Sequence, residues 1–424
     1  METLRNASVP SAHLGGAGGG IERLDVGIVD GRIASLAPHT PGPGRDLDGG
    51  LVLPAFVDIH THLDKGHIWP RKANPDGTWL GALNAVDDDR TRKWAARDME
   101  RRMDFALRCA YAHGTAAIRT HLDSPPGQSE VTWQSFTRVQ TQWAGRIELQ
   151  ASSIEGPDHM LDPEALDALA RLVKSCGGRL GGSVAMHERA RDAVFRVIEK
   201  AGELDLPVDL HIDETLDPAA ISLRHLADAV IETGFSGKVL AGHCCSLSVQ
   251  DERTYRTTID RVAEAGIAVV SLPICNMYLM DRHNEGGELR TPRNRGVTLL
   301  AELRDAGVPV AIASDNTRDP FYAYGDLDAL EVLREGARIL HFDHPQADAW
   351  GWTRTVGGDA AAIAGFDYSA EIKVGAPADL LLFRARTWTE LFARPQADRV
   401  VLRAGVAINT TLPDYRELDD LMEA

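Results

Sequence analysis

Cysteine is scarce in this sequence, and its pattern argues against a disulfide framework. Only five cysteines occur in 424 residues, the number is odd, and no two form a Cys-x-x-Cys pair. Disulfide-stabilised extracellular domains carry paired cysteines, so a reducing compartment fits better. The first residues lack an apolar core of signal-peptide length, and no run reaches the ~20 apolar residues of a membrane span. We therefore expect a cytoplasmic protein with no membrane partner.

Basic charge is also in short supply. The chain has 45 lysines and arginines against 62 acidic residues, which gives a net charge of −17. An acidic protein of this kind repels polyanions, so nucleic acid is excluded as the main partner. Hydrophobic residues make up 44% and charged residues 25%, which is typical of a globular domain. These numbers leave a homo-oligomer open.

A glycine-rich dinucleotide fingerprint is absent, which disfavours a doubly wound open sheet. Apolar, strand-like runs instead alternate with amphipathic helical segments such as 163–175 and 220–234. Strand–helix alternation indicates parallel βαβ units, and eight of them indicate an α/β fold of the closed (β/α)8 type, a TIM-like barrel. The eight expected strands are 52–60, 115–121, 146–153, 179–186, 206–213, 237–243, 267–273 and 308–315.

Both ends of the chain have a different character from this middle part. Near the N-terminus, two short strand-like runs flank Asp30-Gly31, a strong hairpin signal. The C-terminal residues return to strand-like runs after the helical segments end. We expect residues 1–52 and 375–424 to pair into one small β-sandwich domain, with residues 53–374 forming the barrel.

Metal-type ligands stand where several of the expected strands end. His60 and His62 are two residues apart, so on a strand both imidazoles face the same side. His211, His243 and Asp315 end three further strands, and functional side chains of barrel enzymes gather at such ends. Nitrogen and oxygen ligands of this kind suit zinc or iron. The run 179–186 has no lysine that could become a carboxylated bridging ligand, so we expect one divalent metal ion rather than two.

These groups predict hydrolytic chemistry. A metal held by His60, His62, His211 and Asp315 keeps a position open for water and creates a hydroxide nucleophile near neutral pH. Glu214 lies three residues after His211, where a turn can bring its carboxylate over the pocket to move a proton. A surface position is the alternative interpretation.

Four further residues near these positions have two interpretations each. Lys65 is either a substrate contact or part of a surface salt bridge, and His121 is either a pocket residue or a structural histidine. Trp69 and Trp79 either cover an aromatic substrate or pack within their own loop.

The pattern resembles the amidohydrolase superfamily over nearly the whole chain, and within it the cytosine deaminase branch and the N-isopropylammelide isopropylaminohydrolases. The matching stretches are HTHLDK at 60–65, RTHLD at 119–123, HIDE at 211–214, GH at 242–243 and SDNTRDPFYAYG at 314–325. The resemblance implies that His60, His62, His211 and Asp315 bind one divalent metal. It also implies that Glu214, His243 and Asp315 move protons.

The chain departs from the cytosine deaminase pattern at the positions expected to contact the substrate. The glutamine that grips the pyrimidine is replaced by Ile154, and the aspartate that follows the strand-eight ligand is Asn316. Phe321 takes the place of an aromatic residue that packs near the ring. Loss of a buried amide that hydrogen-bonds the substrate ring strongly changes which substrates an enzyme can distinguish. With Lys65, these three positions are our candidate substrate contacts, and we expect a pterin, triazine or purine-like ring as readily as a cytosine-like pyrimidine.

The leading hypothesis is a mononuclear metal-dependent deaminase that releases ammonia from an amino-substituted nitrogen heterocycle, a small-molecule substrate. One alternative is hydrolysis of a cyclic amide or of an alkylamino substituent on the same kind of ring. Another, of a different class, is a catalytically dead binding protein stabilised by a metal. The retained Glu214 and His243 argue against the dead protein.

Overall fold

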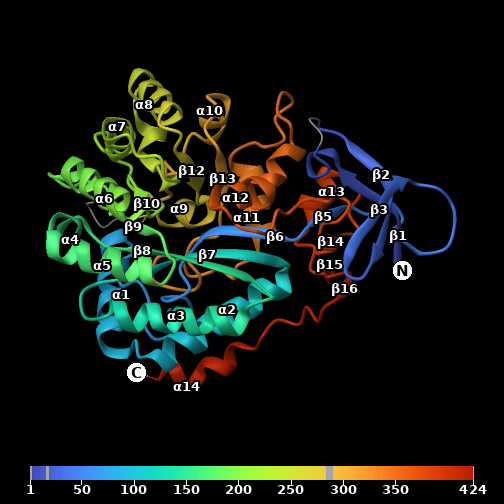
Figure 1. Cartoon of the computed structure of the whole chain (residues 1–424), viewed down its shortest axis with the longest axis horizontal. Helices are drawn as coiled ribbons and strands as arrows, with labels where there is room; N and C mark the ends of the chain where they lie inside the picture. Colours follow the sequence, from blue (N-terminus) through green and yellow to red (C-terminus); the bar gives the residue numbers. More distant parts are fainter. Residues whose placement is uncertain (1, 16–18, 283–289, 424) are drawn as a thin grey trace.

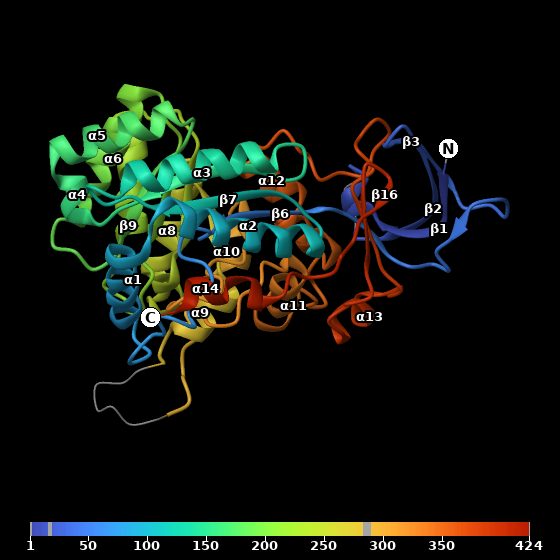
Figure 2. The ribbon, with the colours of Figure 1, turned by 90° about the horizontal axis from the view of Figure 1, so that it is seen from below.

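Two kinds of β structure divide the chain in the computed structural model, which describes residues 2–15, 19–282 and 290–423. Mainly antiparallel sheets lie at one end, and a helix-covered set of parallel strands makes up the rest (Figure 1). Figure 2 shows the same division from below. None of the described helices combines the length and the apolar character needed to cross a membrane.

Parallel strands occupy the centre of the larger part. They form a three-stranded sheet, β6-β7-β8, and a five-stranded sheet in the order β13-β12-β11-β10-β9. Isolated parallel bridges join Ser152 to Arg179 and Thr61 to Asp315, so the two sheets touch at both edges. The strands are β6 (Phe56–Thr61), β7 (Thr115–Asp123), β8 (Glu148–Ile154), β9 (Leu180–Val184), β10 (Val208–Ile212), β11 (Val239–His243), β12 (Ala268–Ser271) and β13 (Val310–Ile312).

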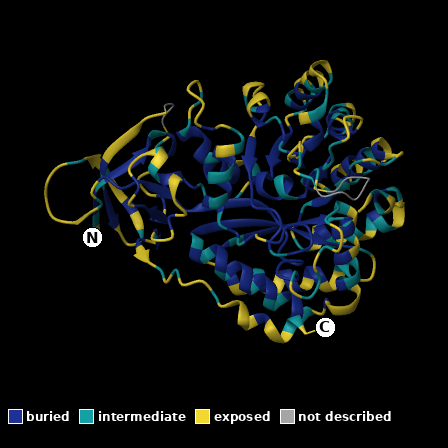
Figure 3. Cartoon of the chain, turned by 180° about the vertical axis from the view of Figure 1, so that it is seen from behind, coloured by how far each residue is buried: buried dark blue, intermediate teal, exposed yellow. Residues whose placement is uncertain are grey.

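Helices cover these strands and turn their polar faces outward (Figure 3). Strands buried on both faces are near-continuous apolar runs, whereas the covering helices are amphipathic. The helices of this part are α1 (Trp79–Lys93), α2 (Ala96–His113), α3 (Ser129–Trp143), α4 (Pro157–Leu161), α5 (Pro163–Ser175), α6 (Ala190–Leu204), α7 (Ser222–Thr233), α8 (Glu252–Glu264), α9 (Pro273–Leu279), α10 (Leu300–Asp305), α11 (Ala329–Ile339) and α12 (Gly358–Ala364). Two 3-10 helices accompany them, η2 (Cys245–Val249) and η3 (Trp350–Val356).

The smaller part consists of two four-stranded sheets that share one apolar core. One sheet, β3-β2-β1-β4, comes from the N-terminal segment, and the other, β16-β15-β14-β5, combines the C-terminal segment with residues 52–54. Leu4 and Val26 from the first sheet pack in the same cluster as Leu380 and Leu402 from the second. The strands are β1 (Glu2–Pro10), β2 (Ile21–Val29), β3 (Arg32–Pro38), β4 (Arg45–Asp46), β5 (Val52–Pro54), β14 (Leu380–Leu382), β15 (Val400–Arg403) and β16 (Val406–Ala407). The short helices η1 (Ser11–His13) and α13 (Trp388–Ala393) flank them.

The expected strand 52–60 is two strands in the structure. Residues 52–54 form β5, which pairs with β14 antiparallel, whereas the parallel strand β6 begins at Phe56. Pro54 has no N–H to donate, and the N–H of Ala55 bonds to Asp379 of the small region. The chain therefore changes sheet at this proline.

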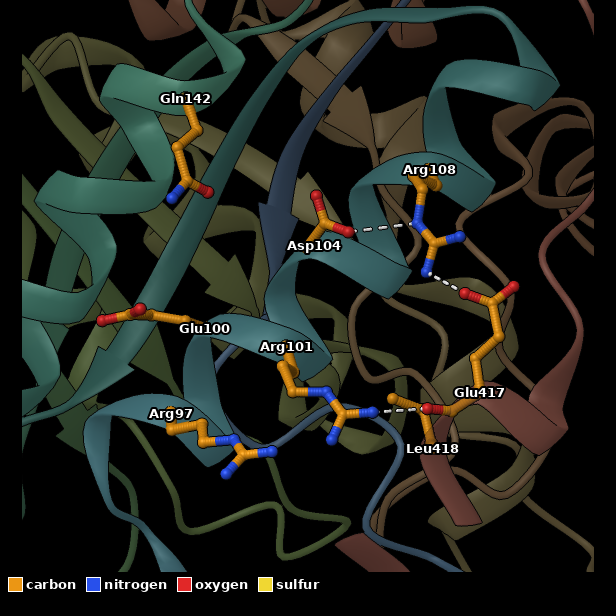
Figure 4. A pocket seen from close by; sticks show the side chains of 8 residues that line it. All are labelled: Arg97, Glu100, Arg101, Asp104, Arg108, Gln142, Glu417 and Leu418. Atoms are coloured by element: carbon orange, nitrogen blue, oxygen red, sulfur yellow. Dashed lines mark hydrogen bonds and ion pairs between the residues drawn. The ribbon is translucent and has the colours of Figure 1, made fainter. Parts of the chain in front are cut away.

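The C-terminal segment crosses back from the small region to α2. It ends in η4 (Tyr415–Leu418) and α14 (Asp419–Met422). Arg108 bonds to Glu417 at 2.8 Å, and Arg101 donates to the Glu417 carbonyl at 2.6 Å, as Figure 4 shows. The ion pair and this hydrogen bond border a cavity of about 380 Å³. Its arginines face carboxylates of the same surface, so the contact holds the segment in place.

Candidate active site

Four ligand atoms converge beneath a cavity at the C-terminal ends of the parallel strands. His60 Nε2 lies 3.1 Å from His211 Nε2, which lies 3.2 Å from His62 Nε2. The Asp315 Oδ1 atom is 3.6 Å from His60 Nε2 and 3.2 Å from His62 Nε2. Atoms bound to a tetrahedral zinc ion at 2.0–2.1 Å lie about 3.3 Å apart. The spacing thus matches the edges of a metal coordination shell.

Hydrogen-bonding partners do not explain this cluster. Within the described residues, both oxygens of Asp315 and the Nδ1 atoms of the three histidines are buried without a partner. Burial, reinforced by neighbouring imidazoles and cations, lowers the pKa of His60, His62 and His211 well below its usual value. The imidazoles are therefore neutral, which is the form that binds metals. Burial and then the Glu214 charge raise the pKa of Asp315, a shift that a bound cation offsets.

Backbone geometry delivers Glu214 and His243 to the same place. Asp213 has a positive φ of 49°, and its carboxylate accepts hydrogen bonds from Ser222 and Leu223 at the start of α7. This turn brings Glu214 back over the pocket, with its Oε1 atom 3.4 Å from His243 Nδ1. His243 and Asp315 have φ values of 69° and 66°, an uncommon conformation for such residues. Strained positions of this kind cluster at functional sites.

His243 is held by a residue that the sequence did not single out. The amide nitrogen of Asn276, in α9, lies 3.0 Å from His243 Nδ1, and both side chains are buried. Burial lowers the pKa of His243. The tautomer decides which ring nitrogen carries the proton, and the Nε2 atom of His243 is buried without a hydrogen-bond partner among the described residues. A polar residue buried at a helix start after β12 is the signal that could have identified Asn276.

The cavity above these groups has a volume of about 360 Å³. All of the expected site residues line it except His60, which lies buried below. One helix face forms a wall: Trp79, Leu83 and Asp87 recur at every fourth position of α1, and Arg90 follows. The opposite side comes from the loop after β8, with Ile154, Glu155, Pro157 and His159. Residues 79–83, expected as part of the loop that carries Trp69 and Trp79, form the start of α1 instead.

Lys65 and Asn316 both line the cavity, and both side chains already form hydrogen bonds to other protein groups. Lys65 is buried, not on the surface, and its Nζ lies 2.7 Å from Asp123 Oδ1. Burial opposes the ammonium charge, but Asp123 and Asp64 raise the pKa of Lys65. The Asn316 amide donates to Asp319 at 2.8 Å and accepts from the Cys275 thiol. Each side chain thus has a protein partner, and the Lys65 ammonium and the Asn316 amide each keep a further N–H group for a substrate.

His121 lies below the cavity rather than in its wall. Its ring centroid is 4.1 Å from that of His60, and neither ring nitrogen has a hydrogen-bond partner among the described residues. With His60 and Asp209 it forms one of three donor groups that could hold a metal, the other two containing His62 with Asp315 and His211 with His243. All three groups share His60. Asp209 is already paired with Arg119 at 2.8 Å.

Comparison with known proteins places this site in a family. The model of the amidohydrolase family matches residues 138–411. The chain belongs to the amidohydrolase family. A pterin deaminase of Rhizobium rhizogenes is 50% identical, with 99% of this chain and 97% of the relative covered. The N-isopropylammelide isopropyl amidohydrolase of a Pseudomonas species is 24% identical over 85% of this chain and 87% of its own length.

Solved structures agree on the fold. A 5-methylcytosine deaminase from Klebsiella pneumoniae superposes with a TM-score of 0.81 at 23% identity, covering 97% of this chain and 98% of its own. N-isopropylammelide isopropylaminohydrolase from Burkholderia multivorans gives 0.75 at 26% identity, covering 97% and 100%. The expected superfamily is confirmed, and so is the expected class, because this amidohydrolase is a hydrolytic enzyme acting on C–N bonds.

Proposed function

We propose that this amidohydrolase is a mononuclear metal-dependent deaminase that releases ammonia from an amino-substituted nitrogen heterocycle, with pterin-like rings as the leading substrate class. One observation carries the proposal. The donor atoms of His60, His62, His211 and Asp315 converge directly beneath a cavity into which Glu214 and His243 also point. A metal site and two proton-transfer groups at one spot is the arrangement that hydrolytic deamination needs.

The donor set suits a single zinc or iron ion. Its converging Nε2 nitrogens and the unpartnered Asp315 oxygens are ligands for such an ion, and β9 offers no lysine for carboxylation. A second ion beside His121 and Asp209 is disfavoured by the Arg119 guanidinium, which already neutralises Asp209. When bound, the divalent metal supplies Lewis-acid activation of a water molecule.

The protein groups account for the protons. Hydrolysis forms a C–O bond at the ring carbon and breaks its exocyclic C–N bond. One proton of the water ends on the ring nitrogen and the other on the departing ammonia. Glu214 delivers a proton to the ring nitrogen, and His243 and Asp315 help to collect the proton that the water loses. General acid–base transfer of this kind contributes about 10²–10⁴-fold to a rate.

Cavity size and wall chemistry support a bicyclic aromatic substrate. Phe321, Ile154 and Leu83 give the walls apolar surface, and the volume lies within the range of small-molecule sites. The 50% identical relative is a pterin deaminase, and the similarity runs through nearly all of both chains. We place Phe321, Ile154, Asn316 and Lys65 around the ring, with Asn316 and Lys65 offering the N–H groups that do not bond to Asp319 and Asp123.

The finer architecture is also part of this proposal. We infer that the two parallel sheets form one closed (β/α)8 barrel, residues 53–374, because bridges join their edges on both sides. The two small sheets then form a β-sandwich from residues 1–52 and 375–424, since they share a core. The acidic charge and cysteine content support a cytoplasmic enzyme, with homo-oligomerisation left open.

Turnover of a substrate panel tests the function. Zinc-loaded and iron-loaded protein is incubated with pterins, aminotriazines, aminopurines and aminopyrimidines, and ammonia and product mass are measured. We expect one ammonia per oxo product, fastest with pterins. An alkylamine or an opened ring would instead identify the alternative hydrolase. Absence of ammonia from every compound would refute the deaminase.

The variant Glu214→Gln assigns the proton-transfer role. It keeps the shape of the side chain but removes its ability to carry the proton, so we expect kcat to fall by about 10²–10⁴-fold. Metal content should remain one ion per chain. Glu188→Gln, at an exposed position, is the matched control and should retain wild-type turnover. A dead binding protein would show no activity for Glu214→Gln to remove.

A further inference from the structure

One aromatic side chain connects the α1 wall of the cavity to Glu214. Trp79 is the first residue of α1, whose start is fixed by Thr78, because its side chain accepts a hydrogen bond from Gly81. The Trp79 indole Nε1 donates to Glu214 Oε2 at 2.9 Å. The other carboxylate oxygen, Oε1, is the one that lies 3.4 Å from His243 Nδ1. The two Glu214 oxygens thus have different neighbours.

A second contact fixes the indole itself. The Trp79 and Phe321 rings meet edge to face, with centroids 6.1 Å apart and an interplanar angle of 68°. Edge-to-face aromatic pairs are favoured geometries, so Phe321 restrains where the indole N–H points. Phe321 comes from the loop after β13 and also lines the cavity. The Trp79 side chain therefore reaches from its helix to residues that lie beside the expected position of the substrate ring.

The indole N–H can only donate, which decides what Trp79 does to Glu214. A carboxylate can rotate about its terminal torsion, which is broad in glutamate. A single fixed donor on Oε2 removes that freedom and leaves Oε1 as the oxygen nearest His243. Charged hydrogen bonds are the strong ones, so this restraint is worth more than a neutral contact.

We propose that Trp79 is a positioning residue that holds Glu214 in the orientation needed for proton transfer, while its ring forms one side of the slot that receives the heterocycle. This inference rests on the proposed role of Glu214. The two functions of the side chain are separable, because the N–H acts on Glu214 and the ring faces the cavity. The proposal therefore predicts different kinetic effects when each is removed.

Two substitutions separate these functions. Trp79→Phe keeps an aromatic ring and removes the donor, so we expect kcat to fall by about tenfold to a hundredfold while KM changes by less than about threefold. Trp79→Leu removes donor and ring, so the same fall in kcat should be joined by a higher KM. Trp69→Phe is the matched control: it makes the same change in the segment before α1, and Trp69 does not line the cavity.

A double-mutant cycle shows whether Trp79 acts through Glu214. In the Glu214→Gln background, Trp79→Phe should cost less than about twofold in kcat, because the charged partner is already gone. A single-variant kcat within about twofold of wild type, or above it, would overturn the inference, and so would full additivity in the cycle. If wild type and Glu214→Gln turn over equally, the proposed function fails instead. Thermal unfolding of each variant identifies any that do not fold.

Discussion

The two β regions of this chain differ in the polar side chains that they bury, although both have apolar cores. The core shared by the antiparallel sheets is aliphatic throughout its described members, from Leu4 and Val26 to Leu380 and Leu402. The parallel strands carry in addition, at their C-terminal ends, buried imidazoles and carboxylates, several without a hydrogen-bond partner among the described residues. An unsatisfied buried polar group costs about 1–3 kcal/mol. The parallel region therefore gives up stability to build a site, and the antiparallel region contributes stability without chemistry.

Removing one donor from the parallel region has the largest expected effect. His211→Ala deletes the nitrogen that lies within 3.2 Å of the Nε2 atoms of both His60 and His62. We expect metal content well below one ion per chain and a turnover loss of about a thousandfold or more. Metal analysis after dialysis and steady-state kinetics with added zinc or iron measure both. Full metal occupancy with near-normal kcat would remove His211 from the site.

A substitution in the antiparallel region should have the opposite pattern of effects, lowering stability and leaving activity intact. Leu380 is 1% exposed and packs between residues of both sheets, so Leu380→Ala leaves a cavity in the shared core. We expect the free energy of unfolding to fall by about 2–5 kcal/mol, with kcat and metal content unchanged below the unfolding transition. Chemical denaturation and kinetics on the same sample test this. A large loss of kcat in the folded protein would show that the two regions are coupled.

The sequence alone predicts which polar side chains gather at the candidate site, because side chains alternate regularly along a strand. His60 and His62 share a face through the two-residue repeat of a strand, and His211, His243 and Asp315 were expected at strand ends. The structure brings these side chains together. Lys65 shows the limit of such patterns, because its buried partner Asp123 is 58 positions away in the chain. Sequence spacing contains no information about such a contact.

The cavity wall could not be predicted for a related reason. Trp79, Leu83 and Asp87 share a face only once residues 79–93 are helical, and the weak amphipathicity of that segment concealed the helix. The chain also changes sheet at Pro54, a point at which the local sequence is continuously apolar. The point at which the chain changes sheet is decided by strand-pairing partners more than 300 residues away. Local propensity specifies elements, whereas long-range pairing decides which surfaces they share.

The smallest expected effect concerns His13, beside the antiparallel region. It is a buried titratable group that is not connected with the site, so its effect is on the pH dependence of stability. Its Nε2 lies 2.7 Å from Thr353 Oγ1. Burial, then the charge of Arg354, lowers the pKa of His13 from 6.5 to about 3. The unfolded chain therefore binds a proton below pH 6.5 that the folded chain does not. Stability is lost as the pH falls from 6.5 toward 3.

Between pH 7 and pH 5.5 this single group should lower the free energy of unfolding by about 1 kcal/mol. His13→Gln keeps a hydrogen-bonding side chain that does not titrate, so the variant should lose about that much less than wild type over the same interval. His344→Gln, at an exposed position, is the control and should follow wild type. Urea unfolding at both pH values measures the difference. Equal slopes for wild type and His13→Gln would mean that His13 takes up its proton without unfolding the chain.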